Sequence, residues 1–529
     1  MTSSSDDSQN TTATRWLPQA GLQQLIFFSI VILYIAARFW RLTAGCLWFD
    51  EIFSVHAARH SWRELFSFVA ADVVHPPLFY ALLKIWIAAG GESLVWLRLF
   101  PFLISVAAIV PLMLLCRALQ LNAAETNLAL LLLAVNGYLI KYAQEVRMYS
   151  LLFFLTLGSL WLFVRFVQEG ARARKLLPAL SAVNLLLVFT HYYGWMVLAS
   201  EVGFVLIWQR FRLKSFLIAL IAPVLCFSPW IYAVISVSRG QGLAQNIGWA
   251  TRPRLSDLAQ LFTLLNEPFY FRQSSIDLYS PWVGVLTIVL FGLPLLVLLW
   301  RRWKHEPGIM AGKSLRLLVS FTLLAPALAF ILSWVLPQSI WGLRHLIVVA
   351  APYAILAAIA LMALRPIEVK YTLLILIGGW FVFAAAAAVA RPKPVNVWCA
   401  WEQLAHRLKQ RPAGDDVTRI YAFEDLVAYH LWFALDANPH STFRVGVIKD
   451  VPGIEEDKAF FLPRDFAEIN LRNDFPRDEN HIWIAFRDLT RVEARPPLNL
   501  AVASGYEVKN VLETDAGGEK AFLVELSRK

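Results

Sequence analysis

Residues 78–89 read LFYALLKIWIAA, an apolar run interrupted only by Lys84. Twelve helical residues at about 1.5 Å each reach about 18 Å, whereas the hydrocarbon core of a bilayer is about 30 Å thick. The run is therefore too short to cross a membrane, and we predict a helix half-embedded in a loop. The orientation of the whole chain depends on this decision.

The composition indicates a membrane protein. Of the 529 residues, 58% are hydrophobic and only 16% are charged, whereas soluble domains contain about 45–50% apolar residues. The 21 Trp and 36 Phe residues suit contact with lipid and its interfaces. The net charge of +10 comes mainly from short clusters between apolar runs, so nucleic acid is not an expected partner.

Eleven apolar runs are long enough, or nearly so, to cross the bilayer. The predicted spans are 22–40, 98–116, 127–142, 148–166, 176–190, 195–208, 215–237, 281–300, 315–335, 345–364 and 371–390. The polar start Met1–Asn10 has no small-residue cleavage signature, so we expect no cleaved signal peptide. Residues 1–21 are predicted to form a cytoplasmic tail, and residues 22–390 the membrane domain.

The basic connections between the runs orient the chain. With the N-terminus inside and residues 78–89 kept out of the count, every strongly basic connection falls on the cytoplasmic side. These clusters are Arg172, Arg174 and Lys175; Arg210, Arg212 and Lys214; Arg301, Arg302, Lys304 and Lys313; and Arg365 with Lys370. Counting residues 78–89 as a span would place them all outside. The first outer loop, 41–97, and the tail from Arg391 are therefore predicted to be extracytoplasmic.

A second domain is predicted at residues 391–529, beyond Arg391-Pro392-Lys393-Pro394. Runs at 419–423 and 482–486 indicate buried strands, residues 425–435 a helix, and residues 506–527 strands around a turn at 515–518. We expect a small α/β domain. The four cysteines, Cys46, Cys116, Cys226 and Cys399, are scattered, so neither a disulfide framework nor a zinc site is expected from them.

Four features place ionisable residues on the predicted outer face. They are LWFDE (47–51, with Asp50 and Glu51), DVVHPPL (72–78, with Asp72 and His75), QEVRMY (144–149, with Glu145, Arg147 and Tyr149) and WGLRH (341–345, with Arg344 and His345). Lesser candidates are His191 and Tyr192 in a tight outer turn and Glu267 in the outer loop 238–280. Each has a plain structural explanation: a helix cap, a turn, a surface ion pair or a membrane anchor. Together they form paired carboxylates and cations that suit a phosphate-bearing lipid substrate.

These motifs resemble the C-type superfamily of membrane glycosyltransferases, and most of all glycosyltransferase family 39. Protein O-mannosyltransferases carry an Asp-Glu pair in the first outer loop followed by His-Pro-Pro-Leu, which Asp50-Glu51 and His75-Pro76-Pro77-Leu78 match. Bacterial members add Arg-x-Tyr after the third span, which Arg147-Met148-Tyr149 matches. Lipid A aminoarabinose transferases are similar but have Lys before the proline pair. The mannosyltransferases' large luminal insert has no counterpart, so we expect a bacterial inner-membrane protein with an envelope acceptor.

The resemblance implies a polyprenyl-phosphate sugar donor, inversion at the anomeric carbon, and a lipid, glycan or protein acceptor. Asp50 is the predicted general base, and Glu51 would orient the acceptor or tune Asp50. The predicted set that binds donor phosphate and sugar is His75, Lys84, Glu145, Arg147, Tyr149, Arg344 and His345, with Asp72, His191, Tyr192 and Glu267 as possible additions. No cofactor is required, although a divalent metal could bind at Asp50 and Glu51.

Two other classes of protein would also carry many spans and outer charges. One is a transporter or flippase for a lipid-linked saccharide, but no internal repeat is detected and the charges gather at one face. The other is a non-catalytic scaffold that displays the C-terminal domain, in which the acid pair would only cap a helix. The scaffold predicts that the acid pair tolerates substitution.

Overall fold

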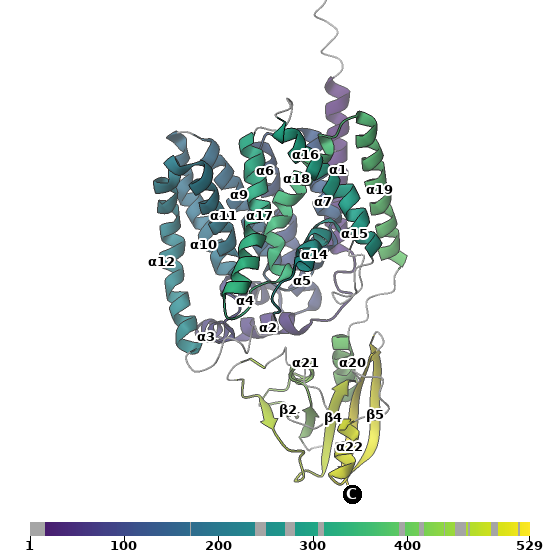
Figure 1. The fold of residues 1–529 in the computed structure, drawn as a ribbon. Helices are drawn as coiled ribbons and strands as arrows, with labels where there is room; N and C mark the ends of the chain where they lie inside the picture. The colour runs from purple at the N-terminus through teal and green to yellow at the C-terminus, as the bar shows by residue number, and fades with distance from the viewer. Residues whose placement is uncertain are drawn as a thin grey trace, which may run out of the picture.

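The computed structural model shows a bundle of helices and, at one end of it, a smaller domain with a β-sheet (Figure 1). The structure describes residues 16–169, 171–238, 250–269, 281–304, 312–390, 397–411, 417–438, 440–449, 462–463, 466–487, 496–516 and 519–529. The polar start Met1–Asn10, the predicted linker 391–394 and residues 517–518 of the predicted turn lie outside this part of the chain.

Helices occupy all eleven predicted spans. In the described ranges, 8 helices are long and apolar enough to cross a membrane. They are α1 (Trp16–Phe39), α5 (Leu94–Ala107) with α6 (Ile109–Ala118), α9 (Tyr149–Gln168), α12 (Leu213–Ser238), α15 (Pro281–Thr287) through η3 (Ile288–Gly292) to α16 (Leu293–Trp303), α17 (Gly312–Val335), η4 (Leu343–Val349) with α18 (Ala350–Met362), and α19 (Ile367–Ala390). The other predicted spans coincide with shorter helices, so the total of eleven stays a prediction.

The shorter helices are α7 (Ala123–Val135), α8 (Gly137–Ala143), α10 (Leu177–Thr190) and α11 (Gly194–Trp208). Short 3-10 turns, η1 (Ala171–Leu176) and η2 (Arg210–Arg212), follow α9 and α11 and carry two of the basic clusters. Gly194 has a packing reason: a Cβ there would lie 2.7 Å from the Leu187 carbonyl oxygen, so α10 and α11 meet too closely for a side chain.

The predicted span 127–142 is wrong as a single helix, because the chain breaks at Asn136. The Asn136 side chain accepts the Leu139 N–H at 2.9 Å and caps α8. It also donates to the carbonyls of Leu264 and Leu265, at 3.0 Å each, in α14 (Leu255–Asn266). The Asn136 side chain therefore binds backbone groups on both sides of the break, which competes with continued helical hydrogen bonding. The dipeptide Asn136-Gly137 is a common turn signal, so the sequence did contain a sign of this break.

Three helices form the loop 41–97, which the basic clusters predict to be the first outer loop: α2 (Phe49–Arg59), α3 (Trp62–Asp72) and α4 (Leu78–Gly90). The helix predicted at 78–89 is thus confirmed. Ser61 and Glu64 cap the start of α3 reciprocally, each side chain accepting the other's backbone N–H. Figure 1 shows α2 and α3 lying across the lower end of the bundle, opposite the end where α1 begins.

Two helices lie at the centre of the bundle. In the spans that contain α9 and α18, 78% and 89% of the residues are buried, against 17% for α1 and α19. A span that is shielded from lipid can carry polar groups toward the protein interior at less cost than a lipid-facing one. Arg147 lies two residues before α9, and Arg344 lies in η4 before α18, so both cations lie at an end of the two best-shielded spans.

The C-terminal domain contains a six-stranded sheet in the order β3-β2-β1-β4-β6-β5. The strands are β1 (Thr418–Ala422), β2 (Phe443–Ile448), β3 (Ile469–Arg472), β4 (His481–Arg487), β5 (Tyr506–Ala516) and β6 (Glu519–Arg528). The first four pair in parallel, and β6 pairs antiparallel with β4 and β5. In the register, Ala422 of β1 lies opposite Ala485 of β4 and Val447 of β2. The predicted strands are confirmed.

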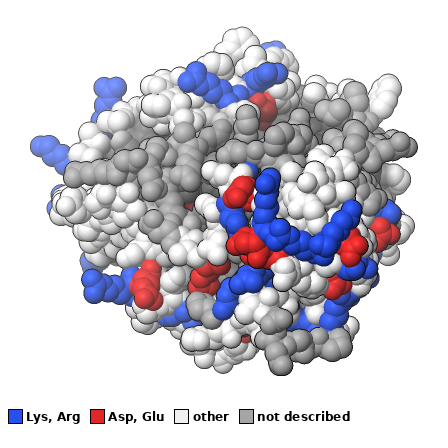
Figure 2. Space-filling model, turned by 90° about the horizontal axis from the view of Figure 1, so that it is seen from below, with Lys and Arg blue, Asp and Glu red and all other residues white. Residues whose placement is uncertain are grey.

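Helices cover both faces of the sheet because apolar residues alternate along its strands. Ile420 and Ala422 pack in the cluster with α20 (Val397–Lys409) and α21 (Asp425–Leu435), whereas Tyr421 and Phe423 pack in the cluster with α22 (Pro496–Ala503). The helix predicted at 425–435 is confirmed. Seen from below, basic and acidic side chains lie next to one another on this end of the molecule (Figure 2).

The C-terminal domain is joined to the outer loop both covalently and by packing. Cys46 and Cys399 form a disulfide across 353 residues of sequence, so the expectation that the cysteines form no disulfide is wrong. Spacing along the chain gave no signal, because the pair is created by folding alone. Ile52 of α2 belongs to the apolar cluster of the sheet and α21, and the ring of His56 bonds the Tyr429 hydroxyl at 2.8 Å.

Candidate active site

The two acids at the start of α2 have different surroundings. Glu51 is completely buried, and its carboxylate accepts the Val146 N–H at 2.8 Å and the Trp48 N–H at 3.1 Å and pairs with Arg98 at 3.2 Å. Its contacts therefore tie three segments together. The cap of α2 involves Glu51 and not, as the simpler explanation had it, the Asp50 side chain.

Asp50 is paired with two guanidiniums, and we name the cluster of Asp50, Arg147 and Arg344 the arginine pocket. Its Oδ2 atom lies 3.0 Å from Arg344 and 3.8 Å from Arg147. The side chain is 18% exposed, against 3% for Arg147 and 23% for Arg344. One carboxylate oxygen is thus shared by cations from two distant parts of the chain.

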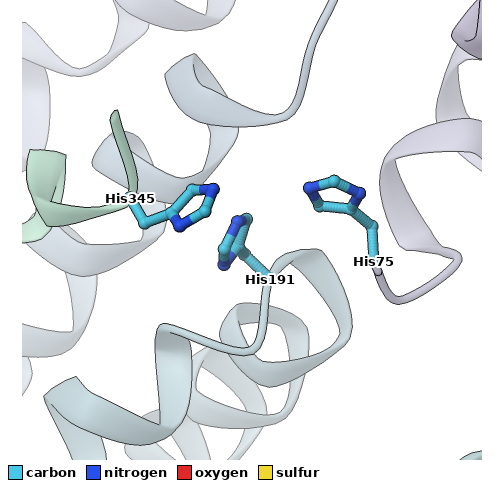
Figure 3. A group of neighbouring side chains, drawn as sticks. All are labelled: His75, His191 and His345. Carbon is cyan, nitrogen blue, oxygen red and sulfur yellow. The ribbon is translucent and has the colours of Figure 1, made fainter. Parts of the chain in front are cut away.

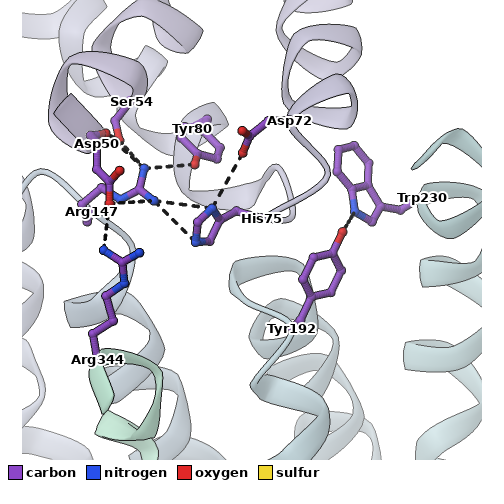
Figure 4. A network of polar contacts seen from close by, with 9 residues as sticks. All are labelled: Asp50, Ser54, Asp72, His75, Tyr80, Arg147, Tyr192, Trp230 and Arg344. Atoms are coloured by element: carbon purple, nitrogen blue, oxygen red, sulfur yellow. Dashed lines mark hydrogen bonds and ion pairs between the residues drawn. The ribbon is translucent and has the colours of Figure 1, made fainter. Parts of the chain in front are cut away.

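Arg147 is the centre of the pocket (Figure 4). One terminal nitrogen donates to the Asp50 carbonyl at 3.1 Å and to the hydroxyl oxygens of Ser54 and Tyr80 at 3.3 Å each. The other lies 3.4 Å from both ring nitrogens of His75. These contacts reach α2, α4 and the turn before α4, so the guanidinium fixes the outer loop against the start of α9.

His75 owes its position to the two prolines that follow it. Pro76 and Pro77 end one conformation and lead into the first turn of α4. His75 is 3% exposed, and its Nδ1 lies 3.9 Å from Asp72. Burial lowers the pKa of His75 well below its usual value, and the neighbouring Arg147 charge lowers it further. The ring is therefore neutral at pH 7.

Arg344 and His345 lie in η4, before α18. The Tyr138 hydroxyl donates to the carbonyls of Leu343 at 2.7 Å and Arg344 at 3.1 Å, which holds this turn in place. A Cβ on Gly342 would lie 2.4 Å from Nδ1 of His345, so the glycine allows the ring to pack against the turn. Sequence reasoning treated Arg344 as a membrane anchor or a phosphate ligand, and its contact with Asp50 places it in the pocket.

Glu145 is buried two residues before Arg147 but pairs with Lys141, at 3.7 Å. Its second carboxylate oxygen has no hydrogen-bond partner. Burial raises the pKa of Glu145 from 4.5 to about 7, although Lys141 opposes the shift. The side chains of Glu145 and Arg147 thus have different partners, Lys141 for Glu145 and Asp50 for Arg147.

With this geometry in view, known structures provide a comparison. The apo structure of ArnT from Cupriavidus metallidurans matches 96% of this chain and 98% of ArnT, with a TM-score of 0.59 and 14% identity. The structure of the same protein bound to undecaprenyl phosphate gives 0.58 and 12%, over 96% and 98% of the two chains. The fold is similar to that of ArnT. Identity this low shows the fold alone, and for the fold the predicted resemblance to membrane glycosyltransferases is confirmed.

The oligosaccharyltransferase of Archaeoglobus fulgidus in its apo form also matches, over 79% of this chain and 64% of that chain. This chain thus spans less than two thirds of the oligosaccharyltransferase. Its TM-score is 0.48 at 11% identity, a likeness on which nothing here depends. No protein-family model matches the chain, and neither does any curated protein sequence.

Within the ArnT-like fold, some predicted site residues lie apart from the pocket. Lys84 donates to the carbonyls of Ala58 and His60 at the end of α2. Tyr192 points toward Trp230, whose indole N–H donates to its hydroxyl at 3.2 Å (Figure 4). Glu267 lies against the break between α7 and α8, where its carbonyl accepts the Gly137 N–H at 2.8 Å. By contrast, His191 and His345 pack together, with ring centres 4.7 Å apart.

Tyr149 borders the pocket without a hydrogen bond from its buried hydroxyl. Its ring lies 4.6 Å from that of Tyr142 and 6.3 Å from that of His345, measured between centres. Burial lowers the pKa of the adjacent His191 to about 3, and Arg147 and Arg344 act in the same direction. The aromatic residues therefore form an uncharged wall beside the cations.

Sequence reasoning missed three pocket residues. Ser54 and Tyr80 contact Arg147, and Arg98 pairs with Glu51. Ser54 had a weak signal, since it lies one helical turn after Asp50. Tyr80 and Arg98 had none, because Tyr80 belongs to an apolar run and Arg98 looked like the boundary of a span.

The geometry bears on both phosphate and metal binding. Arg147 and Arg344 share Asp50 as a counterion, and guanidiniums bind phosphate oxygens through two parallel hydrogen bonds. A divalent ion between Asp50 and Glu51, left open by the sequence, would have to displace Arg344 and Arg98 from these carboxylates. The pocket is thus arranged for an anionic ligand next to a carboxylate.

Proposed function

We propose that this chain is an inverting membrane glycosyltransferase, which moves a sugar from a polyprenyl-phosphate donor to an acceptor on the outer face of the membrane. The observation that carries the proposal is the meeting of Asp50, Arg147 and Arg344 in one outer pocket. The residues come from the first outer loop and from the outer ends of the two most buried spans. A pocket that joins a carboxylate to two cations supplies what both halves of such a transfer need.

The donor phosphate binds Arg147 and Arg344 in this proposal. As the bond between sugar and phosphate breaks, negative charge grows on the phosphate, and fixed guanidiniums stabilise it without having to reorganise. ArnT has been crystallised with undecaprenyl phosphate, and we extend that class of lipid to the donor here. Neutral His75 and the buried Tyr80 hydroxyl keep Arg147 in place.

Asp50 is the general base. Inversion requires the acceptor hydroxyl to attack from the side opposite the phosphate and to lose its proton as the new bond forms. When a phosphate takes the guanidiniums, the Asp50 carboxylate becomes available to the acceptor. Glu51 has no such freedom, because backbone N–H groups and Arg98 use both of its oxygens. We therefore assign Glu51 a structural role and catalysis to Asp50.

The test is sugar transfer by Asp50→Asn in membranes that contain native lipid-linked donors. The amide keeps the shape of the side chain but cannot accept the proton, so we expect transfer to fall about 100- to 10,000-fold. The matched control is Asp474→Asn, because Asp474 is an acid of the C-terminal domain with an 82% exposed side chain. Transfer at the wild-type level in Asp50→Asn would rule out the base.

The same variant separates the enzyme from its rivals. A scaffold needs no carboxylate at Asp50, so Asp50→Asn would leave its function intact. A flippase would move the lipid-linked saccharide across vesicle membranes without cleaving it, and mass analysis of the lipid would find the sugar still attached. Mass analysis of envelope glycans and lipid with and without the chain identifies the acceptor.

A further inference from the structure

Three histidine side chains meet beside the arginine pocket. His75 precedes α4, His191 lies between α10 and α11, and His345 lies in η4. One ring nitrogen from each histidine could bind a metal, and these three nitrogens lie within 4.8 Å of one another. Figure 3 shows the ring of His191 between those of His345 and His75, although the three residues come from segments far apart in the sequence.

Hydrogen bonds within the described part of the chain do not satisfy all the nitrogens of these rings. Nε2 of His191 and both ring nitrogens of His345 are buried without a hydrogen-bond partner. Burying a polar nitrogen without a partner costs free energy, and such groups are rare in folded proteins. These three nitrogens lack a hydrogen-bond partner and lie next to the ring of His75. They indicate a ligand that binds to imidazole nitrogens.

We propose that His75, His191 and His345 form a binding site for a divalent transition-metal ion of the zinc type. Zinc bonds to histidine nitrogen at about 2.0–2.1 Å, so the nitrogens of a tetrahedral site lie about 3.4 Å apart. The present separations exceed that by about 1.5 Å at most, which rotation of the rings can close. Three imidazoles leave a fourth position open for water or a substrate oxygen.

The surroundings contain part of an outer shell. Asp72 lies 3.9 Å from Nδ1 of His75, which is beyond hydrogen-bond distance. In the proposed site a small movement brings the carboxylate onto the ring nitrogen, where it orients a metal-binding histidine. The Tyr193 N–H donates to Nδ1 of His191 at 3.0 Å. Ligation through Nε2 moves the ring proton to Nδ1, so this bond opens when the metal enters.

The neighbouring charges decide which metal fits. Arg147 lies 3.4 Å from the His75 nitrogens and repels any cation, while Asp50 and Asp72 offset part of that charge. Magnesium and calcium need several oxygen ligands, which the three rings lack. Imidazole nitrogen suits zinc, copper, iron and nickel ions. The site therefore excludes the hard cations.

One consequence rests on the proposed function. A metal with an open position next to Arg147 adds positive charge where the donor phosphate would bind. Polyprenyl phosphate should then bind at least about tenfold more tightly to the zinc-loaded chain than to the stripped chain, which corresponds to about 1.4 kcal/mol. Equal affinity of the zinc-loaded and stripped chains for polyprenyl phosphate would show that the metal does not help to bind the donor. It would not contradict the metal site itself.

The site itself is tested without donor or acceptor. The full chain, purified through a tag that lacks histidine and in a Cys226→Ser background, is stripped with a chelator and titrated with Zn²⁺ and Co²⁺. We expect one equivalent of either ion and the visible absorption of four-coordinate cobalt. His191→Ala and His345→Ala should weaken binding at least about 100-fold, since even an outer-shell change costs about 10- to 100-fold. The exposed His406→Ala is the control and should bind like the wild type.

A second variant guards against loss of folding. His345→Cys replaces one ligand by another, so its cobalt complex should gain the thiolate charge-transfer absorption that the parent lacks. Undiminished zinc binding in both alanine variants, or no new absorption in a folded His345→Cys chain, would overturn the site. If the chain binds metal normally but transfers no sugar, the proposed function is wrong and the metal site is retained.

Discussion

The arginine pocket and the exposed ion pairs of Arg472 in the C-terminal domain use the same residue types but bury them differently. In the pocket, Asp50 pairs with Arg147, whose side chain is 3% exposed. In the C-terminal domain, Arg472 pairs with Asp474 and Asp478, which are 82% and 73% exposed. Water screens the second group of charges and leaves the first group strong. Burial, and not the presence of a pair, therefore marks a site at which charge can do chemistry.

The two groups also differ in how the chain assembles them. Arg472 and its partner Asp474 are near neighbours in sequence, whereas 294 residues separate Asp50 from Arg344. Local pairs arise wherever charges are dense, but a pair formed across most of a membrane domain needs the whole fold. Removing the pocket residues should therefore have larger effects than removing the exposed ones.

The largest expected effect is on stability, in Glu51→Ala. This change leaves Arg98 buried without its partner and deprives the Val146 and Trp48 N–H groups of an acceptor. Breaking a buried ion pair from one side costs about 3–5 kcal/mol. Unfolding of the detergent-solubilised chain with denaturant measures the loss. Asp474→Ala is the control, and equal stability of the two variants would contradict the structural role.

Next is Arg344→Met, which removes one of the two cations that we assign to the donor phosphate. Loss of a fixed donor to a developing anion costs about 100- to 1,000-fold in turnover. Sugar transfer in membranes measures it, and Arg472→Met serves as the control. Arg344→Lys keeps the charge but not the paired hydrogen bonds, so it should recover only part of the activity. Full activity in the methionine variant would remove Arg344 from the mechanism.

The third effect depends on pH and concerns Glu145. Its pKa in the folded chain is raised from 4.5 to about 7, so between these values the folded state holds a proton that the unfolded state has lost. Stability therefore falls as pH rises through this interval. Glu145→Gln removes the dependence and should be more stable than the wild type by about 1–3 kcal/mol at pH 8, with the gap closing toward pH 5. Melting temperatures across that range decide it, and parallel curves would contradict the shift.

The smallest effect is expected in the C-terminal domain. Asp478→Ala breaks the contact of Asp478 with Arg472, and the Asp478 side chain is 73% exposed. Exposed pairs contribute about 0–1 kcal/mol, and this contribution falls as salt increases. Denaturant unfolding at low and high salt measures the change. A loss as large as that in Glu51→Ala would remove the contrast between the two regions.

Helix positions could be predicted from sequence because apolar length is a local property. The predicted helix 425–435 and the strands beside it were found by the same local patterns. The break at Asn136 was missed although Asn136-Gly137 is a turn signal, and the carbonyls of α14 that bind Asn136 lie far along the chain. The disulfide between Cys46 and Cys399 was missed because the two residues lie far apart in the sequence.

Part of the site was within reach of sequence. Motifs on one predicted face pointed to Asp50, Arg147 and Arg344, which the fold brings into contact. Sequence could not say that the adjacent acids differ, because Asp50 and Glu51 have equal charge and only their partners separate them. Nor could it show that the Lys84 ammonium donates its hydrogen bonds to carbonyls at the end of α2. The catalytic roles themselves stay predictions.

The helix α2 belongs to two apolar cores at once. Ile52 packs in the core of the C-terminal domain, and Phe53 and Val55 pack in that of the membrane bundle. A chimera that exchanges only the residues after 391 would remove the packing partners of Ile52 and separate Cys46 from Cys399. The unit that can be transplanted between related proteins is therefore discontinuous, and it includes the start of the first outer loop together with the C-terminal domain.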